Sequence, residues 1–460
     1  MGLLPLSANR SPVSPPQKHE RALIPAGMVA ILPRTAQRVR NLEYALMACL
    51  GRWGYEEIIP PTFEYLDVLS AGLEAGVIEK CYTLSDRTTG RILMLRPDVT
   101  AQIARIVGMG MLGSHLPLRL SYRTTVFRYE PDHAGREREI FQIGAELIGE
   151  DDVATDGEII VLMVDCLRTL GLTEFKISVG HVGFFRALLA QSGLLPEAQK
   201  RAEQAAARKD LPRLKEILSA ERVPASKAHA ILEAPGLYGH EEVLARGKRL
   251  AGKNRLARAA VGRLEQIYEL LVAAGVRTHL LLDLGEFRGF DYYDGVVFDV
   301  FADGLGCELG GGGRYNHLIG RFGRDVPSTG FAFDVDRLFR AMEGVSNGAT
   351  SGNLDVVIGA SPDHAALLFQ VGQMLRSRGF RVIQKPITGS PAASLAALAA
   401  HGQELRAPVV ALLDGVALDR KEVLLLHLSG GKESEAGRKK SGLGKPQKVK
   451  LDDLPIALKT

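Results

Sequence analysis

The sequence has 460 residues, with 57 Lys and Arg against 53 Asp and Glu, which gives a formal net charge of +4. Its composition, 46% hydrophobic and 24% charged, is that of a soluble globular protein of roughly two to four domains, and it excludes a disordered chain, a collagen and a disulfide scaffold. The four cysteines form no CxxC pair, so we expect no metal site and no cofactor motif. No apolar run reaches the roughly 18 residues of a membrane span, so we expect a cytoplasmic protein.

The first part of the chain is predicted to fold from a helix into a hairpin. Residues 1–20 are rich in Pro and Ser, which indicates a disordered arm. Apolar residues at helical spacing then predict a helix from Pro33 to Leu50, ended by Gly51. After the strand-like GYEEIIPPTFEYLDVL, residues 116–149 hold two strand-like runs joined by the turn-forming PDHAG.

The rest of the main domain, which we place at residues 21–344, returns to strands after a helical segment. A helix is expected at residues 156–170 and a strand at 175–179. Ala, Arg, Lys, Glu and Leu dominate from about 184 to 272, which predicts a helical insertion. Strand character returns in THLLLDL, in VVFDVFA and around the glycine run GGGG, and STGFAFDVDRLFRAM closes the domain.

The C-terminal part is predicted to be a second, smaller domain. Residues 345–354 have the Gly, Ser and Asn of a linker, and residues 355–428 alternate as βαβαββ, which indicates a small α/β domain. Residues 429–460 are predicted to be a basic disordered tail. From 430 onward the chain has eight Lys or Arg against four Asp or Glu, so the tail accounts for the whole charge surplus. The charges of the remaining body are balanced, which favours a protein partner over a nucleic acid.

The second strand of the hairpin places polar residues on one face. Gln142, Gly144 and Glu146 alternate with apolar residues, so they share one side of the sheet, and the glycine leaves room for a ligand against the backbone. Arg128, near the turn, offers a fork for phosphate or carboxylate, while Glu146 suits an ammonium group. Solvated strand residues in cross-strand ion pairs explain the hairpin equally well.

Three further segments carry candidate site residues. GEFRGFDYYDG sets Arg288, Tyr292 and Tyr293 beside glycines, which suggests a small polar ligand, although one core and one surface tyrosine fit as well. The run GGGGRYNHLIGRFG is either a phosphate-cradling loop or a strand packed closely in a sheet, and it lacks the P-loop pattern. In LRPDVTAQIAR, Asp98 and Thr100 precede an amphipathic helix and could be N-cap residues alone.

Together these segments resemble the class II histidyl-tRNA synthetase family, which includes a paralogue, the regulatory subunit of ATP phosphoribosyltransferase. The likeness runs from about residue 24 to 342 and is carried by GMVAILP, GYEEIIPPTFEY, LRPDVTAQIAR, VFRYEPDHAGREREIFQIGAELIG, RGFDYYDGVVFD, GGGGRYNHLIGRFG and GFAFDVDRLFRAM. It implies an α+β fold, an antiparallel sheet flanked by helices, built as a homodimer.

The resemblance also implies two connected pockets and no metal or other cofactor. Carried over by match, Arg128 and Arg337 would face a nucleotide phosphate. The residues that would form a histidine pocket are Asp98, Thr100, Gln142, Glu146, Arg288, Tyr292 and Tyr293.

Departures from the synthetase wording favour the regulatory branch of the family. The chain reads LRPDVT where synthetases typically read LRPEGT, Asp294 and Gly295 follow the tyrosine pair, Asp336 precedes Arg337, and Pro131 replaces a usual arginine. Losing a cation at an ATP site costs about 3–4 kcal/mol of transition-state stabilisation, by analogy with oxyanion-hole deletions. The resemblance therefore implies a non-catalytic subunit, with no catalytic residue of its own, that partners a short-form ATP phosphoribosyltransferase in histidine biosynthesis and mediates feedback by L-histidine.

Two alternatives remain open at this stage. A working histidyl-tRNA synthetase is one, and a histidine-binding dimer of other purpose is the second. Residues 355–428 stand where a synthetase has its anticodon-binding domain. The second predicted helix of this domain, SLAALAAHGQEL, contains neither Lys nor Arg. Since an RNA-binding face needs cations, we interpret this domain as a degenerate anticodon-binding domain or a protein-contact module.

Overall fold

The computed structural model describes residues 24–25, 27–110, 113, 115–129, 138–285, 292–343, 354–413, 421–428 and 445–459. The chain divides into two compact units, 1–346 and 347–460, and the division falls within the segment predicted to be a linker. The predicted arm at 1–20 lies outside the described residues, as does the predicted linker except for Leu354. In the described ranges no helix has the length and apolarity needed to cross a membrane.

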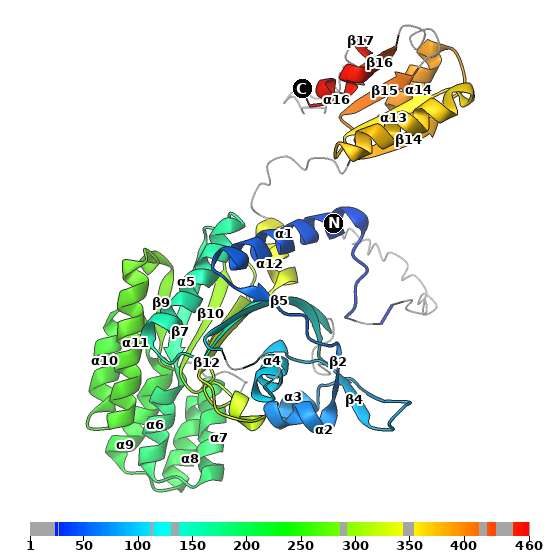
Figure 1. The fold of residues 1–460 in the computed structure, drawn as a ribbon. Helices are drawn as coiled ribbons and strands as arrows, with labels where there is room; N and C mark the ends of the chain where they lie inside the picture. The colour runs from blue at the N-terminus through cyan, green and yellow to red at the C-terminus, as the bar shows by residue number, and fades with distance from the viewer. Residues whose placement is uncertain are drawn as a thin grey trace, which may run out of the picture. The chain divides into compact units, whose positions relative to one another are not determined.

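The first unit consists of a large sheet, a small sheet and the helices that cover them (Figure 1). Its helices are α1 (Pro33–Arg52), α2 (Leu66–Leu69), α3 (Ala75–Ile78), α4 (Val99–Gly108), α5 (Val153–Thr169), α6 (Val182–Ser192), α7 (Pro196–Ala207), α8 (Leu211–Ala220), α9 (Ala225–Glu233), α10 (Glu242–Ala251), α11 (Arg255–Ala273) and α12 (Val335–Glu343). Its strands are β1 (Glu56–Glu57), β2 (Phe63–Tyr65), β3 (Thr83–Ser85), β4 (Ile92–Leu95), β5 (Leu118–Phe127), β6 (Glu139–Ile148), β7 (Phe175–His181), β8 (Tyr238–Gly239), β9 (Leu280–Asp283), β10 (Val296–Ala302), β11 (Glu308–Arg314) and β12 (Ser328–Asp334).

The large sheet has nine strands in the order β1-β5-β6-β12-β11-β10-β7-β9-β8. From β5 to β7 every pair is antiparallel, so the predicted fold class is confirmed at the centre of the sheet. The outer pairs β1–β5 and β7–β9 are parallel, which makes the whole sheet mixed. The second parallel pair follows from the helical segment between β7 and β9, because a parallel connection must carry the chain back to the same end of the sheet.

Helices cover the two faces of the central strands. The predicted helix at Pro33–Leu50 is confirmed as α1, with Pro33 in its first turn and Val39, Leu42 and Leu46 buried. α1 packs with α5 and α12 on one face of the sheet. α4 lies on the other face, where Val99 and Ile103 join a second apolar cluster with residues of β5 (Figure 1).

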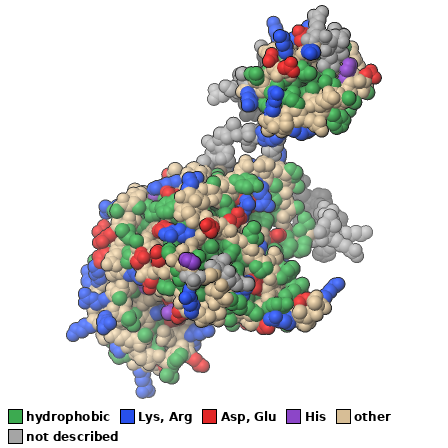
Figure 2. Space-filling model, viewed as in Figure 1, with side chains coloured by type: hydrophobic (Ala, Val, Ile, Leu, Met, Phe, Trp, Pro, Cys, Tyr) green, Lys and Arg blue, Asp and Glu red, His purple; other side chains and the backbone are tan. Residues whose placement is uncertain are grey.

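The segment predicted to be helical, about 184–272, contains α6 to α11 and the short strand β8. One continuous core runs from the sheet into these helices and includes residues of β7, α6, α8 and α11. Their outward faces carry the charged residues of the amphipathic pattern, and Figure 2 shows Lys and Arg side chains along the outer edge of this layer. The insertion is therefore part of the same folded body as the sheet.

The second unit contains a five-stranded sheet with strand order β14-β13-β15-β16-β17. Its elements are β13 (Val356–Ala360), α13 (Ala365–Ser377), β14 (Val382–Pro386), α14 (Pro391–Glu404), β15 (Val409–Leu413), β16 (Glu422–His427), β17 (Gln447–Lys450) and α16 (Leu454–Ala457). The order up to β16 is the predicted βαβαββ, and its α/β class is confirmed.

The disordered tail predicted at 429–460 is wrong for residues 445–459. β17 pairs antiparallel with β16, and Leu454 of α16 is buried in the core of the unit. Composition misled the prediction, because the charged residues Lys450, Asp452 and Asp453 separate the apolar residues Val449, Leu451 and Leu454. Residues 429–444 lie outside the described residues.

Candidate functional site

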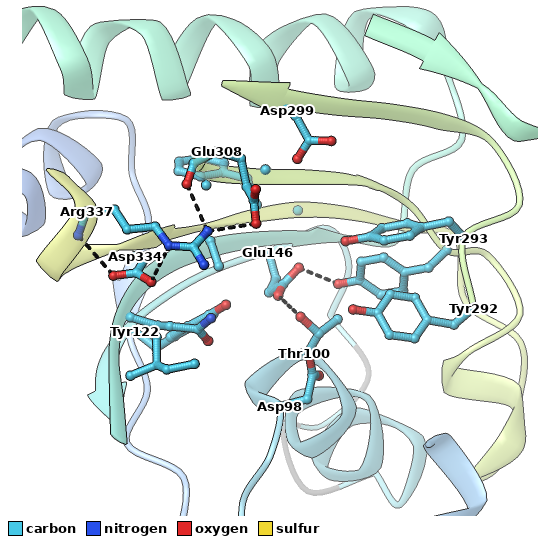
Figure 3. Close-up of a pocket in the computed structure, with 18 of the residues that line it drawn as sticks. Asp98, Thr100, Tyr122, Glu146, Tyr292, Tyr293, Asp299, Glu308, Asp334 and Arg337 are labelled. Carbon is cyan, nitrogen blue, oxygen red and sulfur yellow. Dashed lines mark hydrogen bonds and ion pairs between the residues drawn. The ribbon is translucent and has the colours of Figure 1, made fainter. Parts of the chain in front are cut away.

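A cavity of about 150 Å3 lies on the face of the large sheet that α4 covers. Strands β5, β6, β11 and β12, the start of α4 and the segment before β10 supply its walls (Figure 3). The lining residues are Asp98, Thr100, Tyr122, Arg128, Ile140, Gln142, Glu146, Tyr292, Tyr293, Asp299, Glu308, Gly310, Gly311, Tyr315, Gly330, Phe331, Ala332, Asp334 and Arg337.

The structure brings eight of the nine predicted site residues to this one cavity. They are Asp98, Thr100, Arg128, Gln142, Glu146, Tyr292, Tyr293 and Arg337. The ninth, Arg288, lies outside the described residues. Residues from four distant segments therefore meet at one place.

The start of α4 serves both as a helix cap and as a wall of the cavity. Asp98 is the N-cap, and its carboxylate accepts a hydrogen bond from the Ala101 amide at 2.8 Å. Burial raises the pKa of Asp98, while this hydrogen bond and the Arg128 charge oppose the rise. Capping and site formation are thus not alternatives here, because one side chain does both.

Glu146 is the most deeply buried acid of the cavity, at 1% exposure. Its two oxygens accept hydrogen bonds from the Thr100 hydroxyl at 2.8 Å and from the Tyr315 hydroxyl at 2.5 Å (Figure 3). Burial nevertheless raises the pKa of Glu146 to about 8. A cationic group bound beside it would reverse this effect, since an opposite charge favours the ionised carboxylate.

Tyrosine rings form the wall next to Glu146. The rings of Tyr292 and Tyr293 lie 4.7 Å apart, and Tyr315 meets Tyr292 edge-on at 5.9 Å. All three are buried, and burial raises the pKa of each of Tyr292 and Tyr315 well above its ordinary value. Their hydroxyls therefore stay protonated and can donate or accept hydrogen bonds beside the two carboxyls.

The opposite end of the cavity holds Arg337, whose charge is matched by acids. Its guanidinium donates to Glu308 at 2.7 Å and forms an ion pair with Asp334 at 3.1 Å (Figure 3). Arg128 donates from Nε to the Pro97 carbonyl at 2.9 Å. Among the described lining residues five carboxyl groups stand against two guanidinium groups, so the cavity favours a ligand that carries positive charge.

The geometry corrects one prediction about a glycine and decides between the two alternatives for the glycine run. The space over Gly144 is filled by the ring and hydroxyl of Tyr122, both 2.4 Å from a Cβ added there, so this glycine makes room for a tyrosine and not for a ligand. The glycine run belongs to strand β11 and is not a phosphate-cradling loop. A Cβ at Gly312 would stand 1.9 Å from the Gly330 carbonyl of β12, so close sheet packing requires the glycine.

Sequence reasoning missed Tyr122, Tyr315, Asp299, Glu308 and Asp334 as lining residues. Tyr122 pairs with Gly144 in the β5–β6 register, and this pairing can be read from the sequence only once the turn length is fixed. Tyr315 follows the glycine run directly, but a lone tyrosine at the end of a strand is more typical of a core residue. Within the described residues no cluster of His, Cys, Asp and Glu is suited to a metal ion.

Comparisons with known proteins agree with this architecture. A family model described as histidyl-tRNA synthetase matches residues 27–338. The ATP phosphoribosyltransferase regulatory subunit of Syntrophotalea carbinolica is 37% identical over 90% of this chain and 94% of its own length. The protein of the same name from Moorella thermoacetica is 39% identical over 83% of this chain and 97% of its own.

Solved structures have the same fold. A Bacillus halodurans protein described as an ATP phosphoribosyltransferase regulatory subunit/histidyl-tRNA synthetase superimposes with a TM-score of 0.74 at 27% identity, and it covers 86% of this chain and 100% of its own. Histidyl-tRNA synthetase from a Nostoc species gives a TM-score of 0.75 at 19% identity over 95% of this chain and 98% of its own. The second likeness shows the fold alone.

Proposed function

The chain belongs to the histidyl-tRNA synthetase family and, within it, to the ATP phosphoribosyltransferase regulatory subunits, and from this membership we propose that it activates a separate, short-form catalytic subunit. That subunit would join ATP to 5-phosphoribosyl 1-diphosphate and release diphosphate, as the first step of L-histidine biosynthesis. The catalytic partner carries the reaction, and no residue of this chain is assigned to it.

We further propose that L-histidine occupies the cavity and reports the level of the end product. The observation that supports this is the pair of buried carboxyls, Asp98 and Glu146, facing tyrosine hydroxyls. Histidine offers an ammonium group and an imidazole, and both gain from carboxylate and hydroxyl partners in a buried site. For feedback inhibition, histidine must bind the less active assembly more tightly, and a coupling of about 1–3 kcal/mol would give roughly 5- to 150-fold modulation.

The charge around Arg337 favours this assignment over a working synthetase. Adenylation needs cations free to face the ATP phosphates, and Glu308 and Asp334 already hold the Arg337 guanidinium. Burial and the neighbouring Asp334 carboxylate also raise the pKa of Asp336 to about 6. A phosphate at this end of the cavity would be repelled by the Glu308 and Asp334 carboxylates, which already pair with the Arg337 guanidinium.

The second unit fits a protein contact better than an RNA contact. α14 carries neither Lys nor Arg, and the exposed residues of α13 include Phe369 at 62% exposure. We propose that it is a degenerate anticodon-binding domain used within a hetero-oligomer whose building block is a homodimer of this chain. Sedimentation of the purified chain, alone and with the catalytic subunit, measures both states.

Calorimetric titration with L-histidine tests the cavity assignment. Glu146→Ala removes the acceptor of two hydroxyls and the partner of the ligand cation, so we expect histidine binding to weaken by about 2 kcal/mol or more, roughly 30-fold. Glu197→Ala, at an exposed position on α7, is the control and should bind as the wild type does. Unchanged affinity in the Glu146 variant would remove the cavity from the proposal.

A parallel assay separates the family's two activities. The chain is offered histidine, ATP and tRNA, and we expect no histidyl-tRNA. Robust histidyl-tRNA formation would overturn the regulatory assignment in favour of the synthetase. Histidine binding without any effect on the transferase would instead favour a histidine-binding dimer of other purpose.

A further inference from the structure

Helix α6, the first helix of the inserted segment, lies against the back of the tyrosine wall. Its first residue, Val182, donates its amide to the Gly295 carbonyl at 3.1 Å. One turn later the Arg186 guanidinium donates to the Tyr293 carbonyl at 2.7 Å. Two donors on one helix thus hold the backbone on either side of Asp294, directly behind the rings that line the cavity.

Arg186 has no other polar role in the part of the chain that the structure describes. Its side chain is half-buried, and no described carboxylate forms an ion pair with it. A guanidinium can form five hydrogen bonds and is costly to desolvate, so holding it against a single carbonyl indicates that the position of that carbonyl matters.

The tyrosine backbone is also confined from the opposite side. A Cβ added at Gly313 of β11 would stand 2.9 Å from the Tyr293 ring and 2.6 Å from the Val296 carbonyl. The Tyr293 ring therefore lies against β11, and the amide of the next residue, Asp294, donates to the Arg314 carbonyl of the same strand at 3.0 Å. Arg186 holds the Tyr293 carbonyl from the side of α6.

α6 is itself fixed by the other inserted helices. Asn254, the N-cap of α11, donates through its side-chain amide to the Ala187 carbonyl at 2.8 Å and to Gln191 at 2.9 Å. Lys227 of α9 donates to the Gln191 carbonyl at 2.6 Å. These bonds tie α6 to α9 and α11, and its buried residues Phe184 and Phe185 belong to the shared core.

We propose that Arg186 is a positioning residue for the ligand cavity, through which the helical insertion sets the Tyr292–Tyr293 wall. The inference rests on the proposed function, because its measurable consequence is the affinity for histidine. It gives the inserted helices a role in ligand binding although none of their residues lines the cavity. Arg186 acts by holding the Tyr293 backbone and touches no ligand.

The test is a double-mutant cycle read by calorimetric titration with L-histidine. Arg186→Met removes the donor, and we expect about tenfold weaker binding, with partial recovery in Arg186→Lys, which keeps a cationic donor. In Arg186→Met combined with Tyr293→Phe, the two effects should not add, because both act on one wall. In Arg186→Met combined with Gln142→Ala, at the Arg337 end of the cavity where Gln142 pairs with Asp334, they should add.

A purely structural role makes different predictions. It would lower the melting temperature of the ligand-free protein and leave histidine affinity unchanged, or it would give additive effects in both cycles, and either result overturns the inference. Arg213→Met, at an exposed α8 position, is the control for removing a surface guanidinium. If Arg186→Met fails to fold, Arg186→Gln, whose shorter side chain carries no charge, takes its place in both cycles. Absence of histidine binding by the wild type would overturn the proposed function, whereas full binding by the Arg186 variants would overturn this inference alone.

Discussion

Replacing Glu146 by Gln tests the electrostatics of the cavity without any partner or ligand. The amide keeps the shape of the side chain: its oxygen can accept from one of the Thr100 and Tyr315 hydroxyls, and its NH2 group can donate to the other. Burial raises the pKa of Glu146 to about 8, from the ordinary value of 4.5 for a glutamate. The folded wild type therefore binds one more proton than the unfolded chain between these values, so its free energy of unfolding falls as pH rises through this window.

The magnitude follows from the size of the shift. Each pH unit inside the window lowers the free energy of unfolding by about 1.4 kcal/mol, or roughly 4 kcal/mol from pH 5 to pH 8 if the whole shift is expressed. Glu146→Gln has no such group, so the two proteins should be similarly stable near pH 5, and the variant should be more stable near pH 8.5. Other titrating acids cancel in the difference between the two proteins.

Urea unfolding followed by tryptophan fluorescence measures this difference. The chain has a single tryptophan, Trp53, which packs on the core of the first unit, so the signal reports that unit alone. Glu197→Gln, at an exposed position, is the control and should follow the wild type at every pH. A wild type and a Glu146 variant whose stabilities fall in parallel between pH 5 and pH 8.5 would refute the reasoning.

Three further changes probe the site, the core and the tail. A Cβ at Gly330 would stand 1.7 Å from the Glu146 carboxylate and 2.6 Å from the Ala145 carbonyl, so Gly330→Ala should abolish histidine binding in calorimetry. The control is Gly262→Ala on α11, where the space around the glycine is open; it should leave binding intact and add up to about 1 kcal/mol of stability. Asp156 accepts from Arg314 at 2.7 Å and from Arg263 at 2.9 Å, so Asp156→Asn should lower the free energy of unfolding of the first unit by about 3–5 kcal/mol in urea, and a loss below 1 kcal/mol would contradict its role. Leu454 is fully buried, so Leu454→Ala should destabilise the second unit by about 2–5 kcal/mol and speed amide hydrogen exchange in β16, while unchanged exchange would mean that residues 445–459 do not support that sheet.

Much of the fold could be predicted because local patterns and packing agree. In β6, Ile143, Ala145 and Leu147 are buried against the helices while Gln142 and Glu146 line the cavity, as strand alternation requires. The helix at 33–50 follows from one apolar stripe. The tail could not be predicted in the same way, since β17 and α16 are stabilised by contacts with β16 and the core, and their own composition is that of a disordered segment.

The site could be predicted only in part, because its members come from segments that tertiary structure brings together. Polar residues next to glycines identified Glu146 and the tyrosine pair. The filling of the space over Gly144 by Tyr122 depends on the register of β5 against β6. The pairing of Arg337 with Glu308 depends on β11 and α12 being neighbours, which no local pattern reveals.

The most direct test of the account is reconstitution of the transferase. The short catalytic subunit from the same organism is assayed for phosphoribosyl-ATP formation with increasing amounts of this chain, in the presence and absence of L-histidine. The account predicts that activity rises with the chain to a fixed stoichiometric end point, and that histidine lowers it with the wild type but far less with Glu146→Ala. Phosphoribosyl-ATP formation that is unchanged by the chain, together with histidyl-tRNA formation by the chain alone, would contradict it.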